Sequence, residues 1–93
     1  MDNTVRFRKS IAYIEEHLQE DVNLELAAQA GFTSLMQLYR DCYTYTGHSV
    51  KEYIRKRRLS SALGLIKHSE LPLAEIAYVC GYSSQQALCK YVK

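Results

Sequence analysis

Two stretches of this chain place side chains that can hydrogen-bond to nucleic-acid bases on one face of an expected helix. In the second stretch these residues occupy positions i, i+1, i+4 and i+5, which share a helical face: Gln85, Gln86, Cys89 and Lys90. Glutamine can form two hydrogen bonds with adenine, and arginine can form two with guanine. The same spacing, fifty residues earlier, gives an outward face of Leu35, Met36, Tyr39, Arg40 and Tyr43. Solvent exposure is the alternative for the glutamines, and core packing is the alternative for Leu35 and Met36.

Hydroxyl side chains come directly before both of these stretches. Thr33 or Ser34 can cap the first helix, and Ser83 or Ser84 can cap the second. Backbone N–H groups at a helix N-terminus, together with such hydroxyls, also suit a phosphate oxygen. We expect these four residues to lie near the phosphates of a bound nucleic acid, and a simple capping role is compatible with that.

Basic residues are concentrated in one segment. Residues 1–26 have a net charge of −3 and residues 27–93 a net charge of +5, and KEYIRKRR, residues 51–58, holds five cations in eight positions. Such asymmetry suits a polyanionic partner on one side of the molecule. We expect Lys51, Arg55 and Arg57 to contact phosphate, whereas the alternative is a solvated helix face.

The two stretches belong to an internal repeat. LAAQAGFTSLMQLYR, residues 26–40, aligns with IAYVCGYSSQQALCK, residues 76–90, at a constant offset. Each copy consists of a short helix, a glycine followed by an aromatic residue, and a second helix with its own cap, which indicates a helix-turn-helix. We expect Gly31 and Gly81 to end the first helix of each copy in a left-handed conformation, with the next aromatic packed over the joint. A plain helical bundle is the alternative.

Helical periodicity extends along the whole chain and predicts an all-α fold. We expect helices from Val5 through Leu18, over 24–30, from about 35 to 45, over 50–68 and 73–80, and from 85 onward. Leu38, Cys42, Leu88 and Val92 should point inward. The helix over 50–68 should be about 28 Å long, with a buried stripe formed by Tyr53, Ile54, Leu59, Ala62, Leu63 and Ile66. The chain thus divides into a first unit with its N-terminal helix (5–47), a linker helix (48–68) and a second unit (69–93), all within one region, 1–93.

Several classes of protein do not fit this composition. No apolar run approaches the ~18 residues of a membrane span, and the N-terminus lacks a secretory signal. Three cysteines without a CxxC pair suggest reduced thiols and a cytoplasmic protein. Three histidines, His17, His48 and His68, lie on separate elements without zinc spacing. We therefore expect neither an enzyme nor a bound cofactor.

The motifs YIEEHL, RDCYTYTGHSVKEYIRKRRLSSAL and LAEIAYVCGYSSQQALCK, with the fixed spacing between the units, resemble the DNA-binding domain of AraC/XylS-type transcription regulators from about Tyr13 onward. The resemblance implies two homeodomain-like helix-turn-helix units joined by a long helix, with both recognition helices of a monomer in successive major grooves of double-stranded DNA. It implies base reading by Met36, Tyr39 and Arg40, and by Gln85, Gln86, Cys89 and Lys90. RNA polymerase is an implied partner, and so is an effector-binding domain farther along the chain.

The sequence departs from the family pattern in three respects. Cys42 and Val92 stand where the family usually has phenylalanine, and the family's closing segment after the second recognition helix is absent. The first unit has one residue more than usual between Gly31 and Leu38, which leaves the register of residues 35–37 open. A helical protein-interaction module remains the alternative function, since eight tyrosines could support one. Such a module would show no salt-dependent DNA binding.

Overall fold

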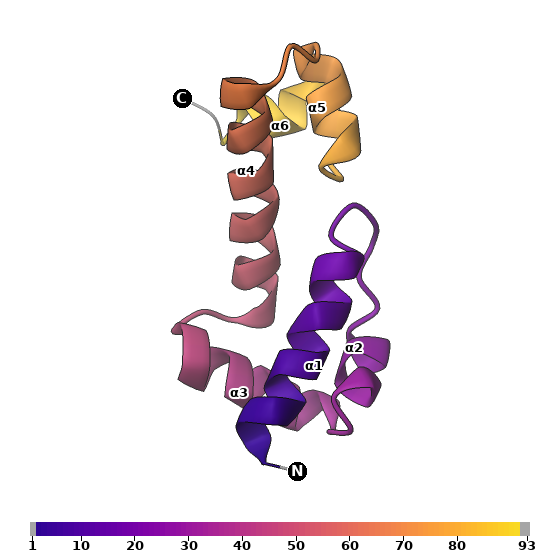
Figure 1. Ribbon diagram of the computed structural model, residues 1–93, viewed down its shortest axis with the longest axis vertical. Coiled ribbons are helices and arrows are strands. Elements are labelled where there is room, and N and C mark those ends of the chain that lie inside the picture. Colours follow the sequence, from indigo (N-terminus) through magenta and orange to yellow (C-terminus); the bar gives the residue numbers. More distant parts are fainter. Residues whose placement is uncertain (1, 92–93) are drawn as a thin grey trace.

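The computed structural model describes residues 2–91, which form six helices and no strand (Figure 1). The all-α prediction is therefore confirmed. The helices are α1 (Asn3–Glu16), α2 (Leu24–Ala30), α3 (Leu35–Thr46), α4 (Val50–His68), α5 (Leu73–Val79) and α6 (Gln85–Cys89). Their ends differ from the predicted ones by a residue or two, and Leu18 lies just beyond α1 yet is buried. Within residues 2–91, no helix combines the length and apolar character of a membrane span.

Side-chain caps start most of these helices where the sequence predicts them. Ser34 Oγ accepts a hydrogen bond from the Gln37 amide at 3.1 Å, and Ser84 Oγ accepts one from the Ala87 amide at 3.0 Å. The serine nearer the helix is thus the cap in both units. Equivalent caps come from Asn23 on α2 and Ser49 on α4. Each contributes about 1 kcal/mol to helix stability.

The chain builds two small hydrophobic cores, one at each end of α4. The first consists of Phe7, Ile14, Leu18, Ala27, Ala28, Leu38, Cys42 and Val50. The second consists of Ala62, Ile76, Ala77, Cys80 and Leu88. The inward positions predicted for Leu38, Cys42 and Leu88 are confirmed, because all three are fully buried, while Val92 lies outside the described residues. Since α4 contributes to both cores, it joins the two units.

The prediction of a single buried stripe along α4 is wrong at the C-terminal end of the helix. Leu63 and Ile66 are 40% and 37% exposed, whereas Ala62 is fully buried and Leu65 packs against the second core. Near its N-terminus the helix packs on the first core through Val50, with Tyr53 and Ile54 partly buried. A helix that touches a different neighbour at each end buries a short patch at each contact instead of one continuous stripe.

The turn of the first unit also differs from the prediction. Gly31 has φ −94°, and the left-handed residue is Phe32, at φ 55°, whereas Gly81 is left-handed as predicted, at φ 87°. The cause is that α2 continues one residue farther than α5, so its cap falls on Gly31 instead of the position equivalent to Cys80. The residue after the cap then takes the positive φ in both units.

Glycine is nevertheless required at position 31, for a different reason. A Cβ there would collide with Ser10 Oγ and the Arg6 carbonyl oxygen of α1. Gly31 thus allows the turn to approach α1 closely. Phe32 does not pack over the joint as predicted: it is 66% exposed, with the Lys9 ammonium 5.2 Å from its ring centroid. Tyr82 does pack against the second core.

Candidate nucleic-acid interface

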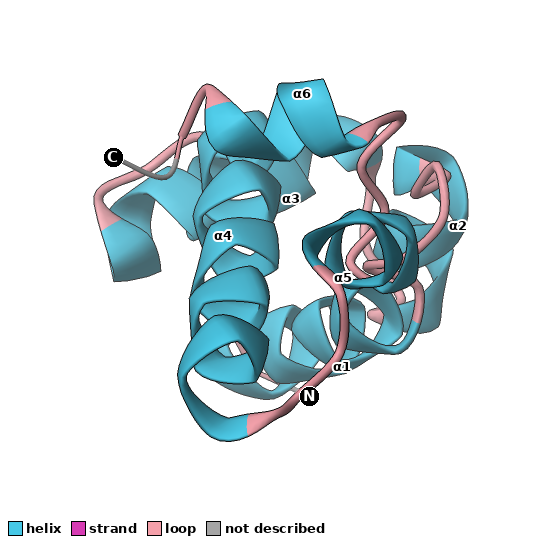
Figure 2. Cartoon of the chain, turned by 90° about the horizontal axis from the view of Figure 1, so that it is seen from above, coloured by secondary structure: helices cyan, strands magenta, loops and turns pink. Residues whose placement is uncertain are grey.

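The second helices of the two units, α3 and α6, lie near opposite ends of the molecule. Figure 1 shows them separated along the long axis, and Figure 2, which looks down that axis, shows both on the same side. The molecule measures 43 × 21 × 21 Å. The 19 residues of α4 span roughly 28 Å, and successive major grooves on one face of DNA are about 34 Å apart. The arrangement is therefore the right size for two recognition helices in neighbouring grooves.

The predicted base-reading residues of α3 are all exposed. Met36 is 66% exposed, Tyr39 is 42% exposed, and Arg40 is also at the surface. Leu35 is half-buried, so it lies between the two roles considered for it. The register of residues 35–37 follows from Gln37, whose side-chain Nε2 donates to Oδ1 of the buried Asp41 at 2.8 Å. That hydrogen bond turns Gln37 toward the protein and leaves Met36 outward.

The residues predicted for base reading on α6 and at its C-terminal cap are exposed as well. Gln85, Gln86, Cys89 and Lys90 are all at the surface, and Leu88 between them is fully buried. Leu88 thus orients this short helix against the second core with its polar face outward. Cys89 is the exposed thiol, whereas Cys42 and Cys80 are buried. Burial raises the pKa of both buried thiols.

A basic residue of α1, Arg6, lies beside the phosphate contacts predicted at the N-terminus of α3. Thr33, Ser34 and Gln37 line an open hollow together with Gln29, Phe32 and Arg6. Arg6 Nε is buried and has no hydrogen-bond partner among residues 2–91. Arg6 was not predicted from the sequence, because it lies on α1, far from Ser34 in the chain, and no local pattern links the two. A guanidinium beside a helix N-terminus suits an anion.

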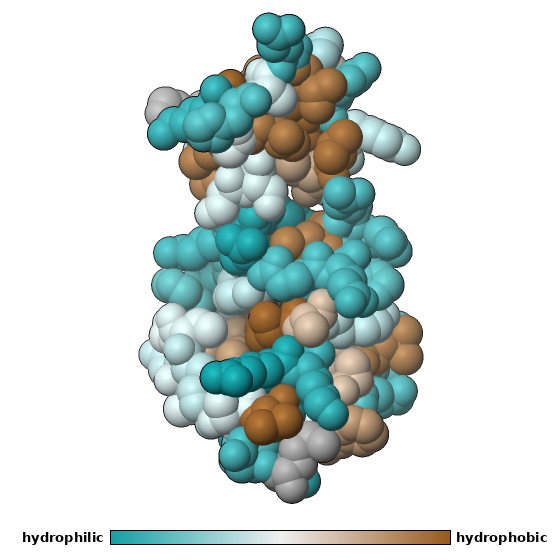
Figure 3. Space-filling model, viewed as in Figure 1, coloured by the Kyte–Doolittle hydropathy of each residue, from teal (hydrophilic) through white to brown (hydrophobic). Residues whose placement is uncertain are grey.

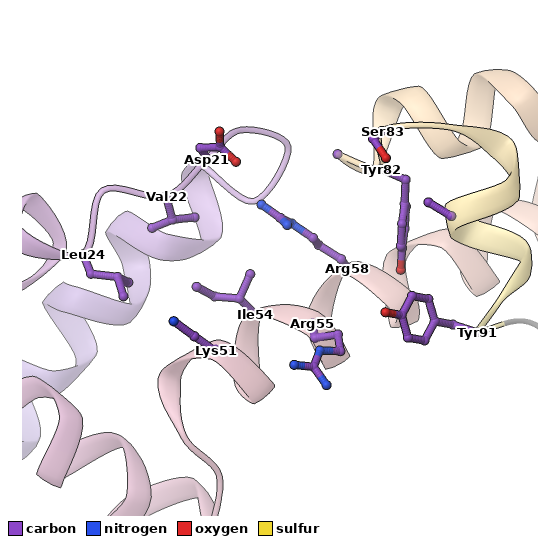
Figure 4. Close-up of a pocket in the computed structure, with 12 residues that line it drawn as sticks. Asp21, Val22, Leu24, Lys51, Ile54, Arg55, Arg58, Tyr82, Ser83 and Tyr91 are labelled. Carbon is purple, nitrogen blue, oxygen red and sulfur yellow. The ribbon is translucent and has the colours of Figure 1, made fainter.

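A groove between the two units gathers most of the remaining phosphate candidates (Figure 4). Lys51, Arg55 and Arg58 come from α4, and Ser83 comes from the turn before α6. Asp21, Val22 and Leu24 line the side of the first unit, and Tyr82 and Tyr91 that of the second. Three of the predicted phosphate contacts thus lie in one groove: Lys51, Arg55 and Ser83. Ser84, the α6 cap, is exposed next to Ser83.

Arg57 has a different environment from its basic neighbours. Its Nε donates to Glu15 Oε1 at 2.8 Å, and the Tyr53 hydroxyl donates to the same oxygen at 2.7 Å. Burial alone would raise the pKa of Glu15, but hydrogen bonds from Arg57 and Tyr53 and the charge of Arg57 lower it overall. These contacts join α1 to α4. The ion pair with Glu15 therefore gives Arg57 a partner within the protein. The predicted contact of Arg57 with a phosphate stays an untested alternative.

The molecule also has an apolar surface. Figure 3 shows hydrophilic side chains across its middle and apolar ones gathered over the second unit. Exposed apolar residues of that end are Leu63, Ile66, Leu71, Tyr78 and Val79. Within residues 2–91, no group of three or more histidine, cysteine or acidic side chains is placed to hold a metal ion.

A family model described as a helix-turn-helix domain matches residues 26–93. The HTH-type transcriptional activator RhaS of Salmonella arizonae is 35% identical over 81 residues, which is 87% of this chain and 29% of RhaS. RhaS of Escherichia coli O139:H28 is 35% identical over 78 residues, 84% of this chain and 28% of that protein. The chain therefore spans less than a third of the length of these relatives.

Solved structures share the fold. The C-terminal domain of AraT, a response regulator from Geobacillus stearothermophilus, has a TM-score of 0.77 and 32% identity, and the match covers 94% of this chain and 76% of that domain. The DNA-binding domain of AdpA, solved in complex with a target DNA, has a TM-score of 0.77 and 26% identity, with 89% and 75% covered. An AraC-type regulator from Chromobacterium violaceum, at 22% identity, matches with a TM-score of 0.83 over 91% of this chain and 76% of that one.

Proposed function

Because the chain belongs to the AraC-type helix-turn-helix family, we propose that it binds double-stranded DNA sequence-specifically, as the DNA-binding part of a transcription regulator. The family is one of regulators and not of enzymes. The observation that carries the proposal is the placement of two exposed, capped recognition helices on one side of a strut about as long as the groove spacing. Each unit alone would bind weakly, and joining them makes the second contact intramolecular.

Base reading falls to the exposed faces of α3 and α6. The Arg40 guanidinium carries the paired donors that bind guanine, and the side-chain amides of Gln85 and Gln86 can bind adenine. Lys90 can reach guanine or a phosphate, and Met36 can meet a thymine methyl group. The full set of proposed base-reading residues is Met36, Tyr39, Arg40, Gln85, Gln86, Cys89 and Lys90, and all of them are exposed.

Phosphate contacts surround these faces. Ser34 and Ser84 cap the two helices, so the free N–H groups of α3 and α6 lie beside them. Lys51 and Arg55 line the groove between the units, where the DNA backbone would cross from one major groove to the next. The proposed phosphate contacts are Arg6, Thr33, Ser34, Lys51, Arg55, Ser83 and Ser84. Arg57 is left out because Glu15 already binds it.

The remaining proposals concern the regulator as a whole. The RhaS relatives are much longer than this chain, which supports an effector-binding domain elsewhere in such a regulator. RhaS is named as an activator, which supports RNA polymerase as a further partner. We propose a cytoplasmic location as well, which the bacterial RhaS relatives support.

Selection from a random pool of double-stranded DNA tests this function. The 93-residue chain is incubated with the pool at about 150 mM salt, where nonspecific binding is weak, and the retained DNA is sequenced. We expect two short motifs about 10 base pairs apart, centre to centre. A single motif would mean that only one unit reads bases.

A protein-interaction module is the second candidate, because of the apolar side chains exposed over the second unit. It would give no enriched motif, and the protein would bind DNA only at low salt. That result would overturn the proposed function.

A further inference from the structure

Arg58 of α4 makes contacts unlike those of the other basic residues in its segment. Its Nε donates to the Leu18 carbonyl oxygen at 2.7 Å, and its Nη2 donates to the Glu20 carbonyl oxygen. Both carbonyls lie in the turn that follows α1, near the negative end of that helix, where a cation is favoured. The guanidinium is thus bound to the backbone of the first unit. Figure 4 shows the side chain extended from α4 toward this turn.

The same turn also meets the second unit. A Cβ built on Gly81 would lie 3.0 Å from the Leu18 carbonyl oxygen and 3.1 Å from Gln19 Cα, so the two backbones nearly touch. In Figure 1 the turn between α1 and α2 points at the segment that follows α5. Residues 18–20 therefore contact α4 through Arg58 and the second helix-turn-helix through Gly81.

The contact at Gly81 gives the two units a connection besides the linker helix, and the Arg58 contact binds the turn that makes this connection to α4. Without them, the second unit would be attached to the first through α4 alone, which Arg57 binds to Glu15 of α1. A Cβ built on Gly64 of α4 would have no neighbouring atom of residues 2–91 within 4 Å, so nothing in this part of the chain supports the helix at that point. Two domains joined by a small interface move relative to one another by default. The Arg58 contact ties α4 to α1 through the turn that follows α1. With this second attachment, the two units should bend less relative to one another than they would on a single helix.

We propose that Arg58 is a positioning residue that holds α3 and α6 at a fixed separation and thereby sets the spacing between the two DNA motifs. The spacing part of this inference rests on the proposed function, whereas the separation of the helices does not. Arg58 differs in role from Lys51 and Arg55, since two of its nitrogens already donate to carbonyls within the protein.

The separation is measured without DNA, by spin–spin distance measurement between two labels. The exposed native Cys89 on α6 takes one label and Thr44→Cys, at an exposed site on α3, takes the other, while Cys42 and Cys80 are buried. We expect one narrow distance distribution for the parent protein and a distribution at least about twice as wide for Arg58→Ala. The matched control is Lys56→Ala, which removes one charge from the same helix at a side chain without a hydrogen bond or ion pair in the described chain.

Arg58→Lys tests the geometry separately, because it keeps the charge but loses the two-nitrogen fork. We expect an intermediate width for it. If Arg58→Ala does not unfold cooperatively, the comparison rests on Arg58→Lys and the Lys56→Ala control. Equal widths for the parent and the cooperatively folded Arg58 variant would overturn the proposal.

Spacing is then tested on DNA selected by the parent protein, with the gap between the motifs changed by one base pair in either direction. We expect the parent to prefer the selected gap, and Arg58→Ala to lose at least about half of that preference in affinity ratio. A uniform loss of affinity at every gap would mean that Arg58 acts only as a charge, and would overturn the spacing claim. If the parent binds no DNA specifically, the proposed function fails, while the label distances still decide whether Arg58 holds the units.

Discussion

Arg57 on α4 and Glu15 on α1 form a forked ion pair, with Nε 2.8 Å from Oε1 and Nη2 3.4 Å from Oε2. The Tyr53 hydroxyl donates to Oε1 from one turn before Arg57 on α4. The pair connects residues 42 positions apart in the chain. It therefore fixes the linker helix on the N-terminal helix, next to the Arg58 contact with the turn after α1.

Breaking this pair should cost little stability, because both side chains are partly exposed to solvent. We expect Arg57→Ala and Glu15→Gln each to lower the free energy of unfolding by about 0.5–1 kcal/mol, with a double-mutant cycle in urea showing positive coupling between them. Lys56→Ala is the control and should have a smaller effect. If Arg57→Ala leaves stability intact but weakens binding to every DNA sequence, Arg57 contacts phosphate after all.

Acid should weaken the same junction. The pKa of Glu15 is lowered from its ordinary value of 4.5, because its hydrogen bonds and the charge of Arg57 outweigh the effect of burial. A carboxyl with a lowered folded-state pKa stabilises the fold above its unfolded pKa, and this stabilisation disappears as pH falls through the folded value. We expect Glu15→Gln to reduce the loss of stability below pH 4.5. The urea midpoint measured from pH 7 downward checks this, and parallel curves for the two proteins would contradict it.

Rising pH should also weaken this junction, through ionisation of Tyr53. Burial and the hydrogen bond to Glu15 raise the pKa of Tyr53 from 10.0 to about 12. The folded state favours the neutral phenol, so its stabilisation is complete below pH 10.0 and is lost as pH rises toward about 12. Burial also raises the pKa of Tyr82, so an absorbance titration of tyrosinate should show late ionisation by both residues, and Tyr53→Phe should remove one late step. Removal of an early step instead would place Tyr53 in solvent.

The glycines at positions 31 and 64 should respond oppositely to alanine. Gly31→Ala places a Cβ against Ser10 and the Arg6 backbone, and we expect it to destabilise the fold by about 1–3 kcal/mol. Gly64 lies inside α4, and a methyl group added there would meet open space, so Gly64→Ala should stabilise by up to about 1 kcal/mol. Thermal unfolding of the two variants, which carry the same chemical change, checks the contrast. Equal shifts in the same direction would contradict it.

Substitutions of base-reading residues and of phosphate-contacting residues should have different effects on DNA binding. We expect Arg40→Ala and Gln86→Ala to cost about 1–3 kcal/mol on the selected DNA only. Lys51→Ala and Arg55→Ala should weaken binding to all sequences and reduce the salt dependence. Titrations of selected and scrambled duplexes at several salt concentrations distinguish the two classes. If both classes act alike on scrambled DNA, Arg40 and Gln86 do not read bases.

The local features of this fold could be predicted from sequence, because the signals that determine them are local. Ser34 and Ser84 cap helices whose first residues follow them directly, and Gly47 ends α3 in a left-handed conformation. Leu38 and Leu88 are buried as their helical spacing predicts. The repeat itself predicts two recognition helices.

The missed features depend on contacts between distant segments. Glu15 meets Arg57, and Arg6 meets the N-terminus of α3, only after α1 has docked, and nothing in the local pattern indicates either contact. The prediction for Gly31 was wrong because α2 continues one residue farther than α5, which places the left-handed conformation at Phe32. Leu63 and Ile66 are exposed because α4 touches a different partner at each end.

The two recognition helices come from a head-to-tail repeat within one chain and carry different side chains, Arg40 on α3 and Gln86 on α6 among them. Two-fold symmetric dimers bind palindromes, which look the same from either direction. This chain has no such symmetry, so its target would have a polarity. Inverting the target would turn the protein end for end on the duplex and present the opposite end, either the N-terminal helix or the apolar second unit, to a neighbouring promoter. For the DNA binding proposed above, the orientation of the site would therefore matter as well as its sequence.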